Sequence, residues 1–169
     1  KATIKDAEFG YAEGGFRLRI PELEIASGEK VAFVGASGSG KTTLLRLLAG
    51  VNAPEKGTID ADGLRLGELS DAERRSFRIR KVGFVFQDFE LIDYLNVREN
   101  ILLPYRINPA LTLDSKVRDE LSGLAESLGL TDKLKRRIDQ LSQGEKQRVA
   151  ICRALLPRPE MILADEPTG

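Results

Sequence analysis

Apolar and polar residues alternate through the first thirty residues of the chain. The alternation is clearest at Phe16, Leu18 and Ile20, and it resumes at Leu23 and Ile25 beyond Pro21. A period of two residues is typical of strands that bury one face. The segment therefore predicts short antiparallel strands.

Short apolar runs further along the chain predict four more strands, at 30–35, 57–63, 81–87 and 161–164. The run at 41–50 has helical spacing and ends in a glycine, which predicts a helix. Ser70 with Glu73, three residues later, has the spacing of a capping box and marks the start of another helix.

From residue 88 to residue 157 the pattern is helical. Asn96 and Glu99 form a second capping-box pair, and residues 142–156 predict a helix that Pro157 ends. A further helix is predicted by apolar residues at helical spacing, namely Val117, Leu121, Leu124 and Leu128. We therefore expect an α/β core, made of 1–87 and 158–169, around a helical subdomain at 88–157.

Composition narrows the choice of function classes. The 169 residues fit one domain, and 26 basic residues balance 26 acidic ones. A zero net charge disfavours a dedicated nucleic-acid surface, so no nucleic-acid partner is expected. No apolar run approaches the roughly 18 residues of a membrane span. The chain has no histidine, and its single cysteine, Cys152, is expected to be a small buried residue.

The segment "GASGSGKT" at 35–42 matches the pattern G-x-x-x-x-G-K-[ST] between an expected strand and an expected helix. Its glycines allow the backbone N–H groups to curl around phosphate oxygens, and the helix adds its positive N-terminus. Lys41 is expected to reach the β- and γ-phosphates, and Thr42 to bind Mg²⁺. The alternative is a Gly/Ser turn before a helix. The expected nucleotide-binding residues here are Gly35, Ala36, Ser37, Gly38, Ser39, Gly40, Lys41, Thr42 and Thr43.

Two adjacent acids, Asp165 and Glu166, follow the apolar run at 161–164. A strand parallel to the one before the phosphate loop would deliver them beside the phosphates. Asp165 is then expected to complete the Mg²⁺ shell, often through water, and Glu166 to act as general base on the attacking water. The alternative is a pair of solvated acids at a strand end.

The segment "LSQGEKQR" at 141–148 has two interpretations. Ser142 and Glu145 form a capping box, which alone explains both, but Gly144 leaves the helix N-terminus open to phosphate. Here the chain resembles the ATP-binding-cassette (ABC) family, whose signature is Leu-Ser-Gly-Gly-Gln. It keeps Leu141, Ser142 and Gly144, and Glu145 replaces the final Gln. Gln143 replaces the first Gly, and its side chain is expected to keep a phosphate further from the backbone at this position.

The resemblance extends over the whole chain and implies two further site residues. Tyr11 lies 24 residues before Gly35, where the family places an aromatic ring that stacks on adenine, although a core tyrosine is the alternative. Gln87 matches the family's glutamine that contacts Mg²⁺ and the attacking water, and an ordinary glutamine at a strand end is the alternative.

The resemblance implies a P-loop NTPase core with a mostly parallel sheet, an N-terminal antiparallel β subdomain and a helical insertion that carries the signature motif. It also implies ATP and Mg²⁺ as cofactors, and an ATPase whose catalytic residues are Lys41, Gln87 and Glu166. Two such domains, as a homodimer or heterodimer, would share two ATP molecules head to tail.

Transmembrane permease subunits would bind the insertion after Gln87 and place the domain on the cytoplasmic face of a membrane. The amino-acid sequences of segments 82–104 and 145–156 look most like those of the lipoprotein-releasing and macrolide-export branch of the family.

Two other functions stay open at this stage. One is a soluble member of the family that acts on DNA or ribosomes, although such members carry large insertions that this chain lacks. The other is a catalytically silent ATP-binding module. The family pattern also continues beyond "EPTG" with an Asp and a His, and this chain has no His. We therefore expect a C-terminally truncated portion of the usual fold, weakly active by itself.

Overall fold

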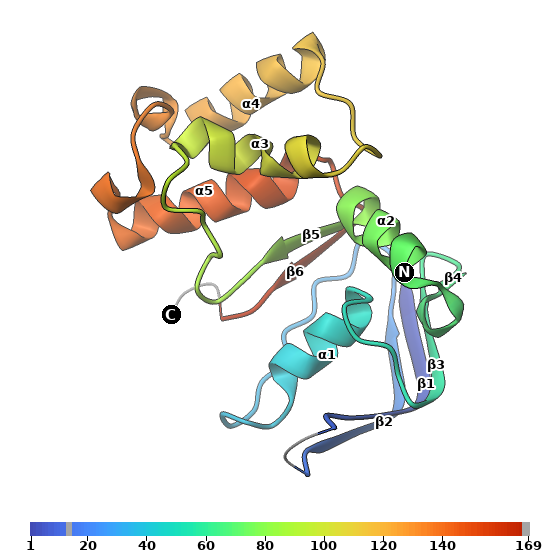
Figure 1. Ribbon diagram of the computed structural model, residues 1–169. Coiled ribbons are helices and arrows are strands. Elements are labelled where there is room, and N and C mark those ends of the chain that lie inside the picture. The colour runs from blue at the N-terminus through green and yellow to red at the C-terminus, as the bar shows by residue number, and fades with distance from the viewer. Residues whose placement is uncertain (13–14, 167–169) are drawn as a thin grey trace. The chain divides into compact units, whose positions relative to one another are not determined.

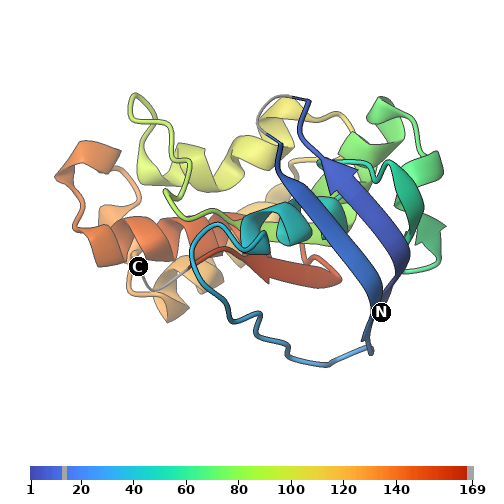
Figure 2. The ribbon, with the colours of Figure 1, turned by 90° about the horizontal axis from the view of Figure 1, so that it is seen from below.

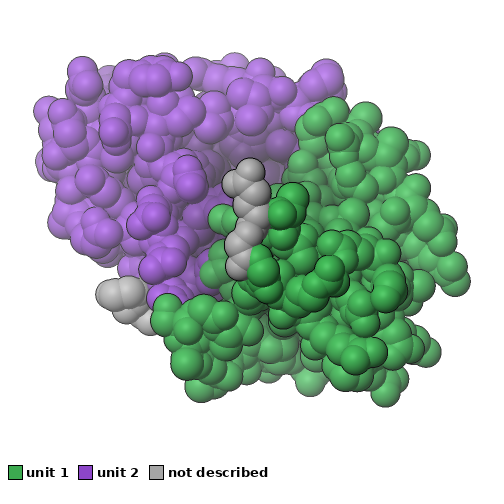
Figure 3. All heavy atoms as spheres, turned by 60° about the horizontal axis from the view of Figure 1, so that its bottom comes forward, with its two compact units in different colours: residues 1–78 green, residues 79–169 purple. Residues whose placement is uncertain are grey.

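The computed structural model describes residues 1–12 and 15–166 (Figure 1). The chain forms two compact units, Lys1–Arg78 and Ile79–Gly169, which Figure 3 colours separately. This division falls near residue 78, whereas the sequence suggested a helical subdomain at 88–157. That finer subdivision stays a prediction.

The first unit is built on a four-stranded antiparallel sheet with the order β2-β1-β3-β4. The strands are β1 (Ala2–Gly10), β2 (Arg17–Ile25), β3 (Lys56–Ala61) and β4 (Leu64–Arg65). Figure 2 shows β1 and β2 side by side. The alternation in the first thirty residues thus predicted the antiparallel strands correctly.

A bulge in β1 explains why the alternation shifts phase at Pro21. Asp6 has a φ of 47°, and the pairing of β1 with β3 slips between Lys5 and Glu8. The facing Gly57 has a φ of 75°, and a Cβ there would lie 2.2 Å from the Asp6 carbonyl oxygen. Only glycine fits so close an approach, and the bulge bends the strand at this point.

Helix α1 (Lys41–Leu48) contacts β3 in the first unit, and its Leu47 and Leu48 are fully buried. Gly50 ends the helix with a φ of 64°, as the sequence predicted. A short η1 (Leu66–Glu68) precedes α2 (Asp71–Lys81). The predicted capping box forms at the start of α2, because the Ser70 N–H donates to the Glu73 carboxylate at 2.8 Å.

The strand predicted at 30–35 is absent from the described structure, and that prediction is wrong. Residues 30–35 have no strand assignment, and Val34 is 97% exposed. A strand persists only where neighbouring backbone satisfies its N–H and C=O groups. The described strands of the first unit all pair within the antiparallel sheet, so the apolar run has no partner strand there.

The second unit contains a parallel pair of strands, β5 (Val82–Val85) and β6 (Met161–Ala164). A Cβ at Gly83 would lie 2.5 Å from the Ala154 carbonyl oxygen. Helix α5 (Gln143–Leu155), which precedes β6, therefore approaches β5 closely only because residue 83 is glycine. The fold is α/β, with an antiparallel sheet and a parallel strand pair.

Three helices cover most of the second unit: α3 (Val97–Ile107), α4 (Ser115–Ser127) and α5, with the short η2 (Thr131–Lys133) and η3 (Ile138–Gln140) before α5. In Figure 1, α3 and α5 lie side by side, and they are in contact. Their shared core buries Val97, Ile101, Leu102, Leu121, Ala125, Leu130, Ile138, Leu141, Val149, Cys152 and Leu156. Among the described residues, no helix is long and apolar enough to span a bilayer.

Cys152 supplies a test of this core. The side chain is fully buried, as the sequence suggested, and burial raises the pKa of its thiol to about 12. Because thiolate is the reactive form, native protein at pH 8 should react with a thiol reagent roughly a thousand-fold more slowly than denatured protein. A Cys152→Ser variant gives the background rate. Fast labelling under native conditions would contradict this packing.

Candidate functional site

The loop at 35–40 curls back on itself ahead of α1. Gly38 and Gly40 have φ angles of 78° and 99°, which L side chains rarely adopt. A Cβ at Gly35 would lie 2.8 Å from Ser39 Oγ, and the Ser39 N–H donates to the Ala36 carbonyl at 3.2 Å. The shape of the loop therefore favours glycine at 38 and 40 through the backbone, and at 35 it leaves little room beside Ser39.

Lys41 folds across this loop. Its Nζ donates to the carbonyl oxygens of Gly35 at 2.9 Å and Ala36 at 3.1 Å. No described side chain caps the N-terminus of α1 at Gly40, and the first turn of that helix contains no acid. The helix dipole and the ammonium group together make a site that fits an anion such as phosphate.

The side chains of Tyr11 and Thr43 form a hydrogen bond that the sequence did not predict. Their hydroxyl oxygens lie 3.4 Å apart, and this hydrogen bond is the main cause that lowers the pKa of Tyr11. The Tyr11 ring packs edge-on against Phe9 at 4.9 Å and is tilted against Phe16 at 6.0 Å. With 41% of Tyr11 exposed, one part of the ring remains accessible to a flat ligand. Thr42, in the first turn of α1, is half-buried.

The two predicted acids of the second unit have different surroundings. Asp165 is 6% exposed, and its N–H donates to the Val85 carbonyl at 3.0 Å, which extends the parallel pairing beyond β6. Glu166 is exposed and has a φ of 43°. The buried acid and the exposed acid are thus turned to different environments, as the sequence indicated.

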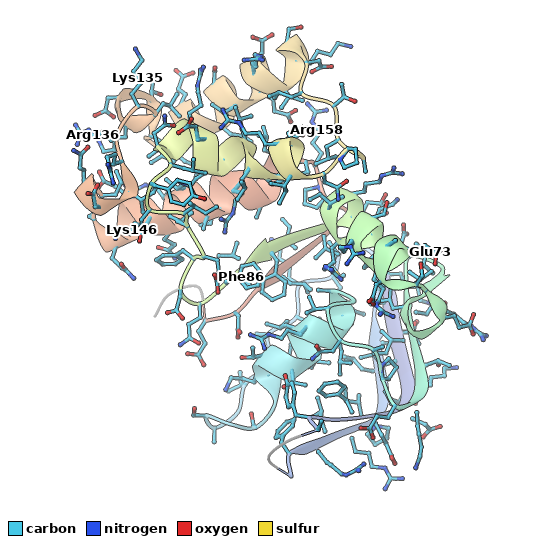
Figure 4. The ribbon with its side chains drawn as sticks, viewed as in Figure 1. Glu73, Phe86, Lys135, Arg136, Lys146 and Arg158 are labelled. Atoms are coloured by element: carbon cyan, nitrogen blue, oxygen red, sulfur yellow. The ribbon has the colours of Figure 1, made fainter. Side chains whose placement is uncertain are left out.

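Gln87 and Glu166 meet at the carboxyl ends of β5 and β6. The Gln87 Nε2 donates to Glu166 Oε2 at 3.4 Å, although 79 residues separate them in the sequence. Figure 4 labels Phe86, the residue before Gln87, at the end of β5. The second unit therefore brings together an amide and a carboxylate that sequence reasoning had assigned to the attacking water.

The signature segment begins α5. Ser142 is the N-cap: its Oγ accepts from the Glu145 N–H at 3.3 Å, and the Glu145 carboxylate accepts from the Ser142 N–H at 2.7 Å. Leu141 is buried, and Gln143 is exposed. A Cβ at Gly144 would make only ordinary contact at 3.6 Å, so the packing of the described chain does not require glycine there.

Basic side chains surround the start of α5. Lys133 Nζ lies 3.4 Å from Glu145 Oε1, and hydrogen bonds from Ser142, with Lys133 as a lesser cause, lower the pKa of Glu145. Figure 4 shows Lys135, Arg136 and Lys146 near the same end of the second unit. Lys133 and Arg136 also pair with Asp132, so part of this positive charge is balanced within the chain, and the helix dipole adds to what favours an anion at this helix end.

The three expected Mg²⁺ ligands, Thr42, Gln87 and Asp165, combine a hydroxyl, an amide and one carboxylate. These are oxygen donors that suit Mg²⁺ when substrate phosphates and water complete the shell. Among the described residues there is no group of three or more His, Cys, Asp or Glu that could hold a metal by itself. Thr42 lies in the first unit and the other two in the second, so their convergence stays a prediction.

Sequence reasoning missed two buried polar side chains of the second unit. Asn100 is fully buried, accepts from the Ile92 N–H at 2.8 Å and donates to carbonyl oxygens of the same loop. Arg153 is 9% exposed. The signal was available in both cases: Asn100 lies on the apolar face of a capped helix, and Arg153 interrupts the apolar run of residues 149–156.

A family model described as "ABC transporter" matches residues 18–169. The chain belongs to the ABC transporter family. This ABC protein is therefore an ATP-binding subunit and an ATPase. It is 41% identical to the lipoprotein-releasing system ATP-binding protein LolD of Coxiella burnetii and 45% identical to the uncharacterized ABC transporter ATP-binding protein YvcR of Bacillus subtilis.

These alignments cover 94% and 88% of the ABC protein, and 69% and 56% of the two relatives. The ABC protein is also similar to a solved dimeric structure of the cassette MJ0796 in a post-hydrolysis state with ADP and Pi. That comparison has a TM-score of 0.87 and 34% identity, and it covers 99% of this chain and 75% of the other. The family resemblance read from the motifs is thus confirmed.

Substitutions at Ser142 test its role as the N-cap of α5 through the free energy of unfolding. Ser142→Ala removes the side-chain acceptor of the capping box and should lower the free energy of unfolding by about 1 kcal/mol. Ser142→Asp retains an acceptor and should restore most of that loss. Urea denaturation of the three proteins measures this difference. Equal losses in both variants would contradict the cap geometry.

Proposed function

We propose that the loop at 35–42 holds the β- and γ-phosphates of ATP, with Lys41 as the cation that contacts them. The observation that carries this proposal is the ammonium group of Lys41, held across a curled glycine loop in front of an uncapped helix. On phosphate binding, Lys41 would exchange two contacts with neutral carbonyls for contacts with anionic phosphate oxygens. Tyr11, which Thr43 anchors, would stack on adenine.

We propose that Glu166 is the general base of hydrolysis and that Gln87 orients the attacking water. Their contact at the ends of β5 and β6 supports this assignment, because a water that replaces the 3.4 Å contact would find an acceptor and a donor together. Glu166 would accept a proton as the water oxygen bonds to the γ-phosphorus and the bond to the ADP oxygen breaks. Thr42 and Asp165, with Gln87, would hold Mg²⁺, which supplies charge neutralisation on the phosphates.

The signature segment is proposed to act on the ATP of a second domain. Gly144 is not required by this chain's packing, and basic side chains surround the helix start, so an approaching phosphate would meet little steric or electrostatic resistance. The MJ0796 structures are titled as dimers, which supports a head-to-tail pair for this protein as well.

Transport is proposed as the use of the hydrolysis energy. Transmembrane permease subunits would bind the segment 88–105 from the cytoplasmic side, and the protein would be peripheral to the membrane. The similarity to LolD favours the lipoprotein-releasing branch. The contact of Gln87 with Glu166 favours an active ATPase over a silent ATP-binding module.

Lys41→Ala tests the phosphate site. Loss of the ammonium group removes charge-assisted contacts, and the affinity for Mg·ATP should fall roughly a hundred-fold in calorimetry. The matched control is Lys116→Ala on the exposed side of α4, which should bind like the parent protein. Unchanged affinity in the Lys41 variant would refute the phosphate site.

Glu166→Gln tests the base. The amide keeps the shape but accepts no proton, so kcat should fall by a factor of roughly 10²–10⁴ while ATP affinity stays within about threefold. ATP should then retain a dimer on gel filtration. Glu126→Gln on α4 is the matched control for the charge change. Normal turnover in the Glu166 variant would remove this residue from the role of base.

A further inference from the structure

Arg153 lies on the buried face of the signature helix α5. Its neighbours Ala150, Cys152 and Ala154 are buried with it. Burial lowers the pKa of the Arg153 guanidinium, because removal from water disfavours its charged form. A buried cation is retained only where it has well-placed partners, so its partners indicate what it does.

The partners of Arg153 are two consecutive carbonyl groups in the loop after β5. Nη1 donates to the Glu90 carbonyl at 2.6 Å, and Nη2 donates to the Phe89 carbonyl. Phe89 and Glu90 have φ angles of 61° and 49°, the left-handed region that non-glycine residues rarely adopt. The planar guanidinium matches two acceptors side by side and holds this strained pair in place.

This strained pair begins only two residues after Gln87. The Phe89 side chain is buried against Val85, Ala150 and Ala154, and the Phe89 N–H donates to the Phe86 carbonyl at 3.0 Å. Gln87 is therefore fixed between the end of β5 on one side and the Arg153-bound carbonyls on the other. A change at either point would move its amide relative to Glu166.

Asn100 holds the opposite end of the same loop. It contacts Ile92, with bonds of 2.8 and 3.1 Å, and donates to the Leu95 and Asn96 carbonyls. Asn100 and Arg153 are thus both buried and both bound to backbone groups of this loop, Asn100 through four hydrogen bonds and Arg153 through two. They differ in position: only Arg153 binds next to Gln87.

We propose that Arg153 is a positioning residue for hydrolysis: from the signature helix it binds the Phe89 and Glu90 carbonyls and thereby sets the place of Gln87 beside Glu166. This role rests on the proposed function of Gln87. It also connects the helix that begins at Ser142 with the water-orienting side chain, through one guanidinium group and two residues of backbone.

The test compares Arg153→Met and Arg153→Lys in the purified full chain, below the melting temperature of each variant. Arg153→Met should lower kcat roughly tenfold to a hundred-fold and leave ATP affinity within about threefold, since the phosphate loop is untouched. Arg153→Lys restores the charge but reaches the two carbonyls with a single ammonium group, so its kcat should lie between those of the parent and the methionine variant. Arg158→Met, at an exposed arginine, is the matched control and should keep normal kcat.

A double-mutant cycle separates positioning from general loss of stability. If Arg153 acts through Gln87, Arg153→Met should cost less than about threefold in kcat when added to Gln87→Ala. Asn100→Ala, which loosens the far end of the loop, should instead lower kcat by the same factor in both backgrounds. Equal factors for Arg153→Met in both backgrounds would overturn the proposal.

Hydrogen exchange supplies a readout that does not depend on catalysis. Arg153→Met should raise the exchange rate of amides in 87–92 without the same increase in α4, and an unchanged rate there would also overturn the proposal. If Gln87→Ala alone leaves kcat unchanged, the water-orienting role of Gln87 fails and the proposal fails with it. If Gln87→Ala lowers kcat and Arg153→Met does not, only the proposal about Arg153 fails.

Discussion

The parallel pairing of β5 with β6 is the constraint on which the second unit depends. Parallel strands bring their carboxyl ends to one edge, and here the register Val85↔Ala164 places Gln87 and Glu166 just beyond the same edge. Asp165 extends the pairing by one backbone bond to Val85 and is buried by it. A shift of the register by one residue would exchange the buried and exposed acids, and the contact between Gln87 and Glu166 would be lost.

The N-termini of α1 and α5, both proposed to bind phosphate, differ in their capping. Helix α1 begins at Gly40 without a side-chain cap, which suits a ligand that is bound within the same unit. Helix α5 is capped by its own Ser142 and Glu145. The Glu145 carboxylate accepts from the Ser142 N–H, and hydrogen bonds from Ser142 lower the pKa of Glu145. A self-capped helix is suited to a ligand that arrives on another domain, because the helix stays ordered before contact.

Local features were predictable from the sequence, and features that depend on distant partners were less so. The capping boxes, the Gly50 helix end and the glycine loop involve residues within a few positions of one another, and all of them form as predicted. The strand at 30–35 failed because hydrophobicity indicates burial but does not supply a pairing partner. The role of Gln87 was expected only through family resemblance, and its contact with Glu166 was not predicted. The Arg153 bonds span more than sixty residues and end on backbone atoms, which no side-chain pattern reveals.

Backbone strain in the second unit is concentrated where chemistry is proposed. Among its described residues, non-glycine positions with positive φ are Phe89, Glu90, Arg158 and Glu166, and three of these lie within five residues of the carboxyl end of β5 or β6. Such conformations cost about 1–3 kcal/mol each and persist only where surrounding contacts determine them. For Phe89 and Glu90 those contacts come from Arg153, whereas Glu166 is held by the strand pairing of Asp165 and by Gln87. Glu166 and Gln87, the proposed base and water-orienting amide, are therefore placed by two independent supports, one from the sheet and one from the signature helix. An event that moves α5 relative to the sheet would change their separation without breaking either strand.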